Sequence, residues 1–500
     1  MLPVVTATEM RALDRTTIDE VGLPALTLME TAGRAVAAAA HAMLANSHGH
    51  VAVVCGPGNN GGDGFVCARV LRARGCDATV YLAAPRTRIT GDAQTHLQIL
   101  ERSGGVVRML DTPSALAELA DAIAHAEVVV DGLFGIGLAR PVEGHFAEII
   151  DTINRGARRL AIDIPSGLDT DNGRVLGTAV RADRTVTMAA HKVALASAPG
   201  FAWCGTVEVA DIGVPAGVLA TQGLRAGLVE ERDVALPASG LLDHKGRRGH
   251  VVVIGGMPGM RGAGRLCATA ALRAGAGLVT LAAAGDPTAD DSVMTTSLAG
   301  TLGTLLEGKA AVVIGPGLGR GEYAAGWVGE VIAAGVPAVF DADALNLVAG
   351  ITEAIAKANG PIVLTPHPGE AARLLGITAT EVEGDRLAAA RAIATRTRAV
   401  VVLKGARTIV CDGTLGEDFC AINPTGGPAL ATGGSGDVLA GVIGALLAQG
   451  LGPAAAARAA VWIHGRAGDE LARTLGDRGV VSSDLPYTIS GVMAKIPRLA

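Results

Sequence analysis

Aromatic side chains are scarce in this 500-residue chain, at 2% of the residues, with 3 Trp, 3 Tyr and 6 Phe. The cores must therefore be filled mainly by Ala, Val, Leu and Ile, and the apolar fraction of 49% is large enough for that. The 69 glycines suit turns between short elements. This composition is typical of α/β proteins, in which small-residue helices pack on parallel strands. A chain of this length is expected to form two domains.

Long blocks of one charge are also missing. The chain has 42 Lys and Arg against 48 Asp and Glu, a net charge of −6. Nucleic-acid-binding proteins usually present a basic stripe with stacking aromatics. We therefore expect no nucleic-acid partner.

Cysteine pairs with the spacing CxxC do not occur. The seven cysteines are scattered along the chain: Cys55, Cys67, Cys76, Cys204, Cys267, Cys411 and Cys420. This pattern is typical of a reduced, cytoplasmic chain without structural zinc.

A secretory signal is not expected, because the start MLPVVTATEMRALD lacks a basic segment and a long apolar core. One uncharged stretch, 438–457 (VLAGVIGALLAQGLGPAAAA), is long enough to cross a bilayer. Gln449 and the break GLGP at 450–453 favour instead a buried helix, a turn and a second helix. We therefore expect no membrane partner.

Short β-branched runs alternate with Ala- and Arg-rich helical stretches in both halves of the chain. In the first half, strands are predicted at 51–55, 78–82, 128–131, 160–164, 185–188 and 206–210. In the second half, strands are predicted at 251–254, 277–282, 311–314, 338–340, 362–364, 399–403 and 408–411, with helices from Asp437 onward. Such alternation predicts βαβ crossovers and parallel sheets. We predict two three-layer α/β/α domains, 1–223 and 224–500, with two helices in 7–44 that pack on the first sheet.

The motif GPGNNGGDG (56–64) follows the first of these strands and precedes a helical pattern that starts at Phe65. A glycine loop between strand and helix lets backbone amides and a helix N-terminus approach a phosphate. Its two asparagines and Asp63 do not suit a phosphate alone. A plain tight turn is the alternative, because Asn and Asp tolerate left-handed geometry.

Two further acids, Asp131 and Asp163, end predicted strands of the same half. The carboxyl ends of parallel strands meet at one edge, so these acids and Asp63 should converge on one crevice. The loop GIGLARP (135–141) adds flexible backbone and one cation, which suit a diphosphate. Asn60, Asp131 and Ser166 offer the oxygen ligands that a hard cation prefers.

Lys192 lies just past another predicted strand end, in AAHK (189–192). Its position alone favours a solvated surface charge over a catalytic group. His191 is a weaker candidate still.

The sharpest signal of the second half is ATGGSGDVLAG (431–441). Consecutive glycine amides at a helix start form an anion hole, and the helix N-terminus should keep Asp437 ionised. Such an aspartate can take a proton from a hydroxyl that attacks a phosphate. At another strand end, KGART (404–408) can bind nucleotide phosphate or ribose.

Three more strand ends carry GPGLG (315–319), TPHPGE (365–370), and the pair Asp341 and Asp343. His367, in the second of these motifs, either contacts a substrate or caps Glu370 or a backbone carbonyl.

These motifs, in this order, resemble two known families. The second half resembles the ribokinase-like nicotinamide-nucleotide hydrate dehydratases through GGMPGMRGA (255–263), RAGAGLVTL, IGPGLG, LTPHPGE, VVLKGART and TGGSGDVLAG. The first half resembles the Rossmann-like YjeF-type hydrate epimerases through LMETAGRA, GPGNNGGDG, DGLFGIGLARPVEG and AIDIPSGLDTDNG. Met257 departs from the small polar residue expected there.

The resemblance covers nearly the whole chain and implies one enzyme with two activities. Its substrates would be NADHX and NADPHX, the R and S epimers of reduced dinucleotides hydrated at C6. One half would interconvert the epimers. The other would dehydrate the S form to NADH or NADPH, consuming ADP or ATP and releasing phosphate with AMP or ADP.

In the first half, the resemblance implies a potassium ion near Asn60, Asp131 and Ser166. It implies dinucleotide contacts at Asn59, Asn60, Gly61, Gly62, Asp63, Gly135, Ile136, Gly137, Leu138, Ala139, Arg140, Pro141 and Asp163. Proton transfer by Asp163, with Lys192 as its partner, is our hypothesis, because epimerisation at C6 needs acid assistance and no redox cofactor.

In the second half, the resemblance implies that Asp437 deprotonates the C6 hydroxyl. Hydrate contacts are implied at Ala263, Gly317, His367 and Asp437. Nucleotide contacts are implied at Lys404, Gly405, Ala406, Arg407, Thr408 and Gly436, with Mg²⁺ accompanying ADP or ATP.

Two alternatives stay open. A ribokinase-like half alone would suit a small-molecule kinase acting on a hydroxymethylpyrimidine or a sugar, although the fused epimerase-like half argues against it. A nucleotide-sensing or scaffold protein would keep the fold without the chemistry, but Asp163, Lys192 and Asp437 are all present. The sequence does not decide between ADP and ATP. We expect a homo-oligomer, with a tetramer as one possible form.

Overall fold

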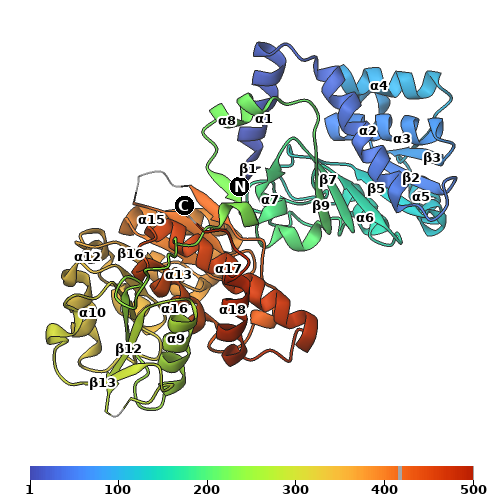
Figure 1. Cartoon of the computed structure of the whole chain (residues 1–500). Helices are drawn as coiled ribbons and strands as arrows, with labels where there is room; N and C mark the ends of the chain where they lie inside the picture. Colours follow the sequence, from blue (N-terminus) through green and yellow to red (C-terminus); the bar gives the residue numbers. More distant parts are fainter. Residues whose placement is uncertain (286, 415–418, 499–500) are drawn as a thin grey trace. The chain divides into compact units, whose positions relative to one another are not determined.

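The computed structural model describes residues 1–285, 287–414 and 419–498. The chain divides into two compact units, Leu2–Leu224 and Arg225–Ala500, with Met1 grouped with the second. In Figure 1 the first unit runs from blue to green and the second from yellow-green to red.

The first unit is built on a seven-stranded sheet with the order β4-β3-β2-β5-β6-β7-β9, in which every pair is parallel. Its strands are β2 (His50–Cys55), β3 (Asp77–Leu82), β4 (Val106–Met109), β5 (Val128–Gly132), β6 (Arg159–Ile162), β7 (Arg184–Met188) and β9 (Thr206–Ala210).

Helices cover both faces of this sheet. On one face lie α2 (Ala25–Met43), α3 (Asn59–Ala73) and α4 (Gly91–Arg102), which pack on one another (Figure 1). On the other lie α5 (Pro113–His125) and α6 (His145–Ile153). Successive residues of β2 alternate between the two layers: Val51 and Val53 join the first core, and Ala52 and Val54 join the second. Both faces of the strand are therefore buried, which explains its unbroken apolar run.

The first residues form an arm that contributes to the same unit. Strand β1 (Leu2–Val5) pairs in parallel with β8 (His191–Lys192), and α1 (Ala7–Arg15) and the π-helical turn η1 (Thr16–Glu20) follow it. The unit also contains the short helices α7 (Val193–Ala196) and α8 (Ala216–Thr221).

The second unit has a longer sheet, with the order β13-β12-β11-β14-β15-β16-β17-β18-β19-β10. It is parallel from β13 to β17, antiparallel through β18 and β19, and parallel again between β19 and β10. The strands are β10 (Ala226–Leu228), β11 (His250–Ile254), β12 (Leu278–Ala284), β13 (Met294–Leu298), β14 (Ala311–Ile314), β15 (Ala338–Phe340), β16 (Ile362–Leu364), β17 (Val400–Leu403), β18 (Ile409–Asp412) and β19 (Cys420–Ile422).

One helical layer of this unit comprises α9 (Arg261–Arg273), α16 (Ser435–Ala448), α17 (Pro453–Leu475) and α18 (Leu485–Met493), which share a core with the sheet. Other helices form a second connected group: α10 (Ala324–Ala334), α11 (Asp343–Val348), α12 (Thr352–Ala356), α13 (Pro368–Leu375), α14 (Ala379–Gly384) and α15 (Arg386–Thr397).

The long uncharged stretch at 438–457 is two helices, α16 and α17, separated by a turn at Gln449–Gly452. Within the described part of the chain, no helix is long and apolar enough to cross a membrane. The interpretation of this stretch as a buried helix, a turn and a second helix is confirmed.

The predicted α/β class is confirmed, and the strands expected at the centre of both sheets are present. Among the described residues, six strands were not predicted: β1, β4, β8, β10, β13 and β19. They are short or lie toward the edges, where one exposed side weakens the apolar pattern. The expected extension of β6 to Ile164 is wrong, because Asp163 has a φ of 63° and ends the strand.

Candidate active sites

The polar loops of the first unit meet where its strand order reverses, since β2 lies between β3 and β5. Ligands of open α/β sheets bind outside the carboxyl ends of the strands at such a point. The loops after β2 and β5 approach so closely that a Cβ on Gly56 would lie 1.9 Å from the carbonyl oxygen of Leu133. Position 56 therefore requires a glycine, because the two loops leave no room for a side chain.

Helix α3 begins at Asn59, inside the glycine motif rather than after it as predicted. Asn59 and Asn60 thus lie in the first turn, whose backbone amides have no partner within the helix. Gly61 and Gly62 allow neighbouring atoms to pack closely against the start of α3. A Cβ on Gly61 would lie 2.1 Å from the carbonyl oxygen of Gly56, and one on Gly62 would lie 2.5 Å from a methionine sulfur.

A cavity of about 830 Å³ lies in this crevice. It brings together these predicted residues: Asn59, Asn60, Asp63, Gly135, Ile136, Gly137, Leu138, Ala139, Arg140, Asp163 and Lys192. Gly61, Gly62 and Pro141 do not line it. The lining also includes residues that sequence analysis missed, from α1, α2 and α4, because these helices carry no polar strand-end motif: Met10, Arg11, Asp14, Ala25, Leu28, Met29, Ala32 and Asp92.

Asp163 and Lys192 form a buried ion pair in the cavity wall. Lys192 Nζ lies 2.5 Å from Asp163 Oδ1 and also donates to Thr187 Oγ1 at 2.9 Å and to the carbonyl of Met188 at 2.8 Å. These three acceptors use all three hydrogens of the ammonium group. The side chain of Lys192 is 0% exposed, so the surface-charge interpretation is wrong. The left-handed backbone of Asp163 is the kind of strain, roughly 1–3 kcal/mol, that often occurs at functional sites.

Two more carboxyl groups, from Asp14 and Asp63, lie close enough to interact electrostatically with this ion pair. Burial raises the pKa of Asp14 to about 6, against the lowering effect of Lys192. Burial also raises the pKa of Asp63 well above its usual range, and the charges of Asp163 and Asp14 add to this effect. The N-cap residue of α3 is Gly58, which has no side chain to cap the helix.

Asn60 and Ser166 both contact the backbone of Phe134, and Ser166 in turn contacts Asp131. Ser166 Oγ donates to Asp131 Oδ1 at 2.6 Å, and Asn60 Nδ2 donates to the carbonyl of Phe134 at 3.0 Å. Asp131 is fully buried, and it accepts hydrogen bonds from Ser166 and from the amide of Leu133. Burial raises its pKa to about 6.

One buried carboxylate among neutral oxygen atoms suits a monovalent cation. The described residues contain no group of three or more His, Cys, Asp and Glu that could hold a metal ion. The residues present thus offer one carboxylate together with neutral oxygen donors.

The second unit has a corresponding point of reversal between β11 and β14. Gly315 has a φ of 126°, and a Cβ there would lie 1.8 Å from the carbonyl oxygen of Asp341. Two predicted hydrate contacts lie side by side, because a Cβ on Gly317 would be 3.1 Å from the Cβ of Ala263. The amide of Met257, the residue that departs from the family pattern, donates to the carbonyl of Gly317 at 2.9 Å.

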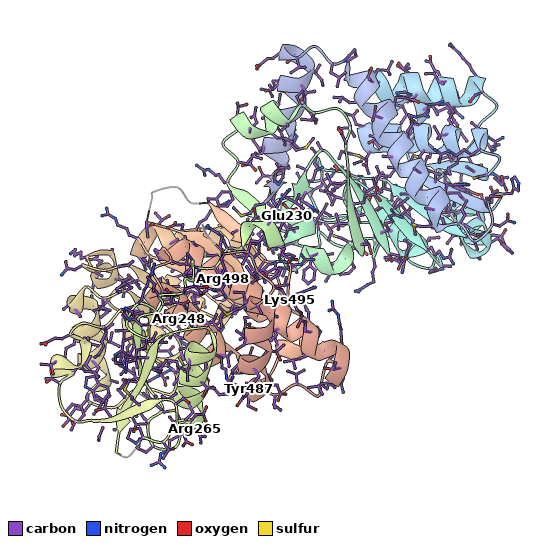
Figure 2. All side chains as sticks on the ribbon, viewed as in Figure 1. Glu230, Arg248, Arg265, Tyr487, Lys495 and Arg498 are labelled. Carbon is purple, nitrogen blue, oxygen red and sulfur yellow. The ribbon has the colours of Figure 1, made fainter. Side chains whose placement is uncertain are left out.

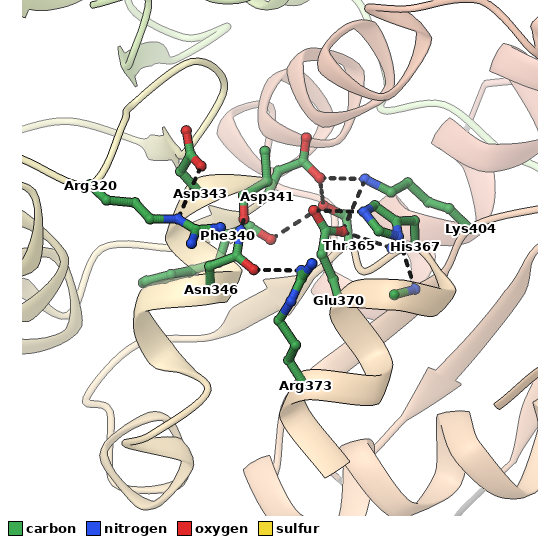
Figure 3. Close-up of polar contacts among 12 residues, drawn as sticks. Arg320, Phe340, Asp341, Asp343, Asn346, Thr365, His367, Glu370, Arg373 and Lys404 are labelled. Atoms are coloured by element: carbon green, nitrogen blue, oxygen red, sulfur yellow. Dashed lines mark hydrogen bonds and ion pairs between the residues drawn. The ribbon is translucent and has the colours of Figure 1, made fainter. Parts of the chain in front are cut away.

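A charged cluster lies at the carboxyl ends of β15, β16 and β17 (Figure 3). Lys404 Nζ lies 2.6 Å from Asp341 Oδ1 and 3.8 Å from Glu370 Oε2. Thr365 Oγ1 donates to Asp341 Oδ1 at 2.7 Å. Lys404 Nζ would lie 3.3 Å from a Cβ on Gly436, in the first turn of α16. This places Lys404 between the acids and the start of α16.

Asp437 follows Gly436 in that first turn. Burial raises its pKa to about 7, and the nearby charge of Asp341 adds to the increase, while Lys404 opposes it. The expectation that the helix N-terminus keeps Asp437 fully ionised is therefore wrong, because desolvation and neighbouring acids outweigh the helix dipole. A carboxyl group with a pKa near neutrality is well suited to general acid–base chemistry.

His367 caps helix α13. Its Nδ1 accepts from the amide of Gly369 at 3.0 Å, and Glu370 Oε2 accepts from the amide of His367 at 2.8 Å. The capping alternative thus describes this side chain. His367 Nε2 lies 3.4 Å from Glu370 Oε1, and the side chain is 51% exposed. Contact between the imidazole and a substrate stays a prediction.

The predicted nucleotide loop at 404–408 is a tight turn between β17 and β18. Gly405 and Arg407 have positive φ values, and Thr408 Oγ1 donates to the carbonyl of Gly405 at 2.9 Å. The buried guanidinium of Arg386 donates to the carbonyl of Lys404 at 3.1 Å and pairs with Glu383. Sequence analysis missed Arg386, since nothing in its helical surroundings signals that it supports this turn.

A second cavity of about 400 Å³ lies away from these residues. It is lined by the segments just before β11 and β12 and by the C-terminal ends of α9 and α18, and it includes Arg247, Arg248, Arg273 and Arg498. Arg248 and Arg498 are labelled in Figure 2. This edge of the sheet is opposite the carboxyl ends that carry the charged cluster.

Each unit thus has a lysine–aspartate pair and additional acids at the carboxyl ends of a parallel sheet, which defines an α/β enzyme with two sites. The family described as YjeF-related protein N-terminus matches residues 25–194, and the one described as NAD(P)H-hydrate dehydratase matches residues 251–490.

Several relatives match over nearly their full length. The bifunctional NAD(P)H-hydrate repair enzyme Nnr of Moorella thermoacetica is 42% identical over 522 residues, covering 99% of this chain and 98% of the relative. The Escherichia coli enzyme of the same name is 35% identical over 497 residues, covering 97% and 93%.

Among solved structures, an ADP/ATP-dependent NAD(P)H-hydrate dehydratase from Bacillus subtilis, co-crystallized with ATP/Mg²⁺, is 28% identical. It covers 53% of this chain and 97% of its own, with a TM-score of 0.46.

The chain belongs to the bifunctional NAD(P)H-hydrate repair enzymes. The family predicted from the motifs is confirmed.

Proposed function

We propose that this protein repairs hydrated nicotinamide dinucleotides at two sites, with the epimerase in 1–223 and the dehydratase in 224–500. The observation that carries the proposal is the pairing of two acid–base centres, Asp163 with Lys192 in one unit and Asp437 with Lys404 and Asp341 in the other. Each centre lies at the carboxyl edge of a parallel sheet, where this fold places its ligands.

In the dehydratase, Asp437 takes the proton of the C6 hydroxyl while that oxygen attacks the terminal phosphorus of ADP or ATP. The bond from this phosphorus to the bridging oxygen breaks, and AMP or ADP leaves. The new C6 phosphate ester is a better leaving group than hydroxide. Its C–O bond breaks as the lone pair of the ring nitrogen forms a C=N bond, and loss of a proton from the neighbouring carbon gives the reduced dinucleotide. Gly317, Ala263 and His367 contact the hydrate.

Nucleotide binding in this half is assigned to Lys404, the turn Gly405–Thr408 and Gly436. Lys404 can neutralise charge that develops on the transferred phosphate. Its ion pair with Asp341 holds its ammonium beside the start of α16. Mg²⁺ enters mainly through the nucleotide phosphates, as this ion commonly does. ADP is the expected donor.

In the epimerase, the dinucleotide occupies the 830 Å³ cavity, with its phosphates near the first amides of α3 and the loop 135–141. Asp163, paired with Lys192, exchanges a proton at the C6 oxygen. Asn60, Asp131 and Ser166 would hold potassium, which supplies positive charge next to the buried carboxylate of Asp131. We also propose that the protein acts in the cytoplasm and forms a homo-oligomer, with a tetramer as one possible form.

The decisive assay mixes the protein with Mg²⁺, chemically hydrated NADH, and either ADP or ATP. Reduced nicotinamide absorbs at about 340 nm, so its recovery reports repair directly. We expect recovery with ADP and none without nucleotide. Consumption of nucleotide without recovery of absorbance would contradict the proposal and favour a small-molecule kinase. The ATP arm compares the two donors.

A further inference from the structure

Asp14 lies on α1, ahead of residues 25–194, where the chain matches the YjeF family. The arm that carries it is fixed to the epimerase site at three places. Strand β1 pairs with β8, so that Val5 lies opposite Lys192 in the register. The amide of Ala7 donates to Asp171 Oδ1 at 2.6 Å, and Arg11 Nη2 donates to the carbonyl of Ile136 at 3.2 Å.

The start of α1 is itself well defined. Thr6 Oγ1 accepts from the amide of Glu9, and Glu9 Oε2 accepts from the amide of Thr6, which makes a complete capping box. Met10 and Leu13 are buried in a small core with Val5. Residues on one side of the helix can therefore be held in a fixed position toward the cavity.

Asp14 occupies that side. It lines the same cavity as Asp163 and Lys192, as do Met10 and Arg11 from the same helix. The carboxyl group is partly buried and makes no hydrogen bond or ion pair within 1–285, 287–414 and 419–498. A partly buried carboxyl without a partner, facing a ligand cavity, calls for a functional explanation.

Neither Lys192 nor Asp163 is suited to donate a proton to the substrate of the epimerase. Lys192 directs the three hydrogens of its ammonium group at Asp163, Thr187 and Met188, which leaves none for a substrate. Asp163, in contact with that cation, is suited to accept a proton rather than to deliver one. A second group must therefore protonate the departing oxygen.

Asp63 and Asp14 are the two candidates near the ion pair. Burial raises the pKa of Asp63 well above its usual range, and the charge of Asp163 adds to this effect. Asp14 has a pKa of about 6, raised by burial and by Asp163 and lowered by Lys192. Arg11 and Asp92 are further charged residues in the lining. Only a group of intermediate acidity can both give and regain a proton near neutrality.

We propose that Asp14 is a catalytic acid of the epimerase and that the amino-terminal arm completes this active site. The inference rests on the proposed epimerase function. Asp14 gives its proton to the C6 hydroxyl as the C6–O bond breaks, and the lone pair of the ring nitrogen forms a C=N bond while water leaves. Water then adds to the other face of planar C6, and Asp163 takes the proton it releases. Solvent returns the proton from Asp163 to Asp14.

The test uses the full-length protein with Asp14→Asn, Asp14→Glu and, as a matched control, Asp19→Asn. Asp19 lies on the same arm but is exposed and outside the cavity lining. Epimerisation of R-NADHX is followed by NMR across pH 5–9, and thermal unfolding of each variant shows whether the unit that carries Asp14 is folded.

We expect Asp14→Asn to lower the kcat of epimerisation by about 10²–10⁴-fold, with KM nearly unchanged and the pH limb assigned to Asp14 lost. Asp14→Glu should restore part of kcat, and Asp19→Asn should match wild type. A kcat for Asp14→Asn within twofold of wild type, or a change in KM alone, would overturn the proposal. So would an Asp14→Glu variant as inactive as Asp14→Asn. If wild type itself does not epimerise, the proposed function fails instead.

Discussion

The ionisation of Asp437 should control the rate of dehydration. If this group takes the proton of the C6 hydroxyl, the reaction needs its carboxylate form. Burial and the charge of Asp341 raise its pKa to about 7. Activity should therefore be full above this pH and fall as the pH drops through it.

The size of the effect follows from that pKa. About 10% of Asp437 is ionised at pH 6 and about 90% at pH 8, so kcat should fall about tenfold per unit below pH 7. Asp437→Asn should lower kcat by about 10²–10⁴-fold, which is the usual contribution of a general base. Nucleotide binding should be largely retained in this variant.

Asp341→Asn tests the physical cause. Removing the negative charge beside Asp437, while leaving Lys404 positive, should lower the pKa of Asp437 and move the acid limb of the profile to lower pH. The assay is the recovery of absorbance at about 340 nm from purified S-NADHX with saturating ADP and Mg²⁺, from pH 5 to 9. Asp477→Asn, an exposed site after α17, is the matched control and should leave the profile unchanged.

A flat profile between pH 5 and 8 would refute this reasoning. An Asp437→Asn variant with wild-type kcat would refute the base assignment. An acid limb that moves to higher pH in Asp341→Asn would refute the electrostatic explanation.

Three further predictions concern other parts of the molecule. Potassium should raise the unfolding temperature and the epimerase activity of the wild-type protein relative to tetramethylammonium. Asp131→Asn should abolish both effects. Equal effects in the two proteins would show that Asp131 does not bind the cation. Gly56→Ala should destabilise the first unit by about 1–3 kcal/mol, measured by thermal unfolding. Gly58→Ala should destabilise it less, because a Cβ at this position meets nothing within 4 Å. Equal losses of stability in the two variants would contradict the contact with Leu133. Burial lowers the pKa of His464 to about 4. As the pH falls below 6.5, the unfolded chain therefore takes up a proton at this residue before the folded chain does. The free energy of unfolding should decrease by about 1.4 kcal/mol for each pH unit from 6.5 down to 4. His464→Gln should remove that dependence in urea titrations, and an unchanged slope would contradict it.

The sequence was most informative at the centres of the two sheets. Strands buried on both faces, such as β2 and β5, appear as continuous apolar runs, and the motifs after them locate the crevices. Edge strands such as β4 and β13 have no such run. The strands β18 and β19 are antiparallel to their neighbours, and nothing in their sequence distinguishes them from parallel strands.

At the two sites, the features that could not be predicted from the sequence depend mainly on contacts between residues far apart in the chain. Asp14 lies on a helix without a motif, and contacts between the amino-terminal arm and distant segments, such as the pairing of β1 with β8, hold that helix at the cavity. The burial of Lys192 depends on acceptors from β7 and its end, Thr187 and Met188, which local sequence cannot place. The raised pKa of Asp437 likewise depends on Asp341, which is distant in the chain.

The most direct test of two activities in one chain is the extent of repair of an epimer mixture. With excess ADP and Mg²⁺, wild type should restore all of the absorbance at about 340 nm from mixed R- and S-NADHX, because the R form is converted before dehydration. Asp163→Asn should stop at the fraction that was S at the start, at an unchanged initial rate. A wild-type reaction that also stops at the S fraction would contradict the account, as would an Asp163→Asn variant that completes the repair at the wild-type rate.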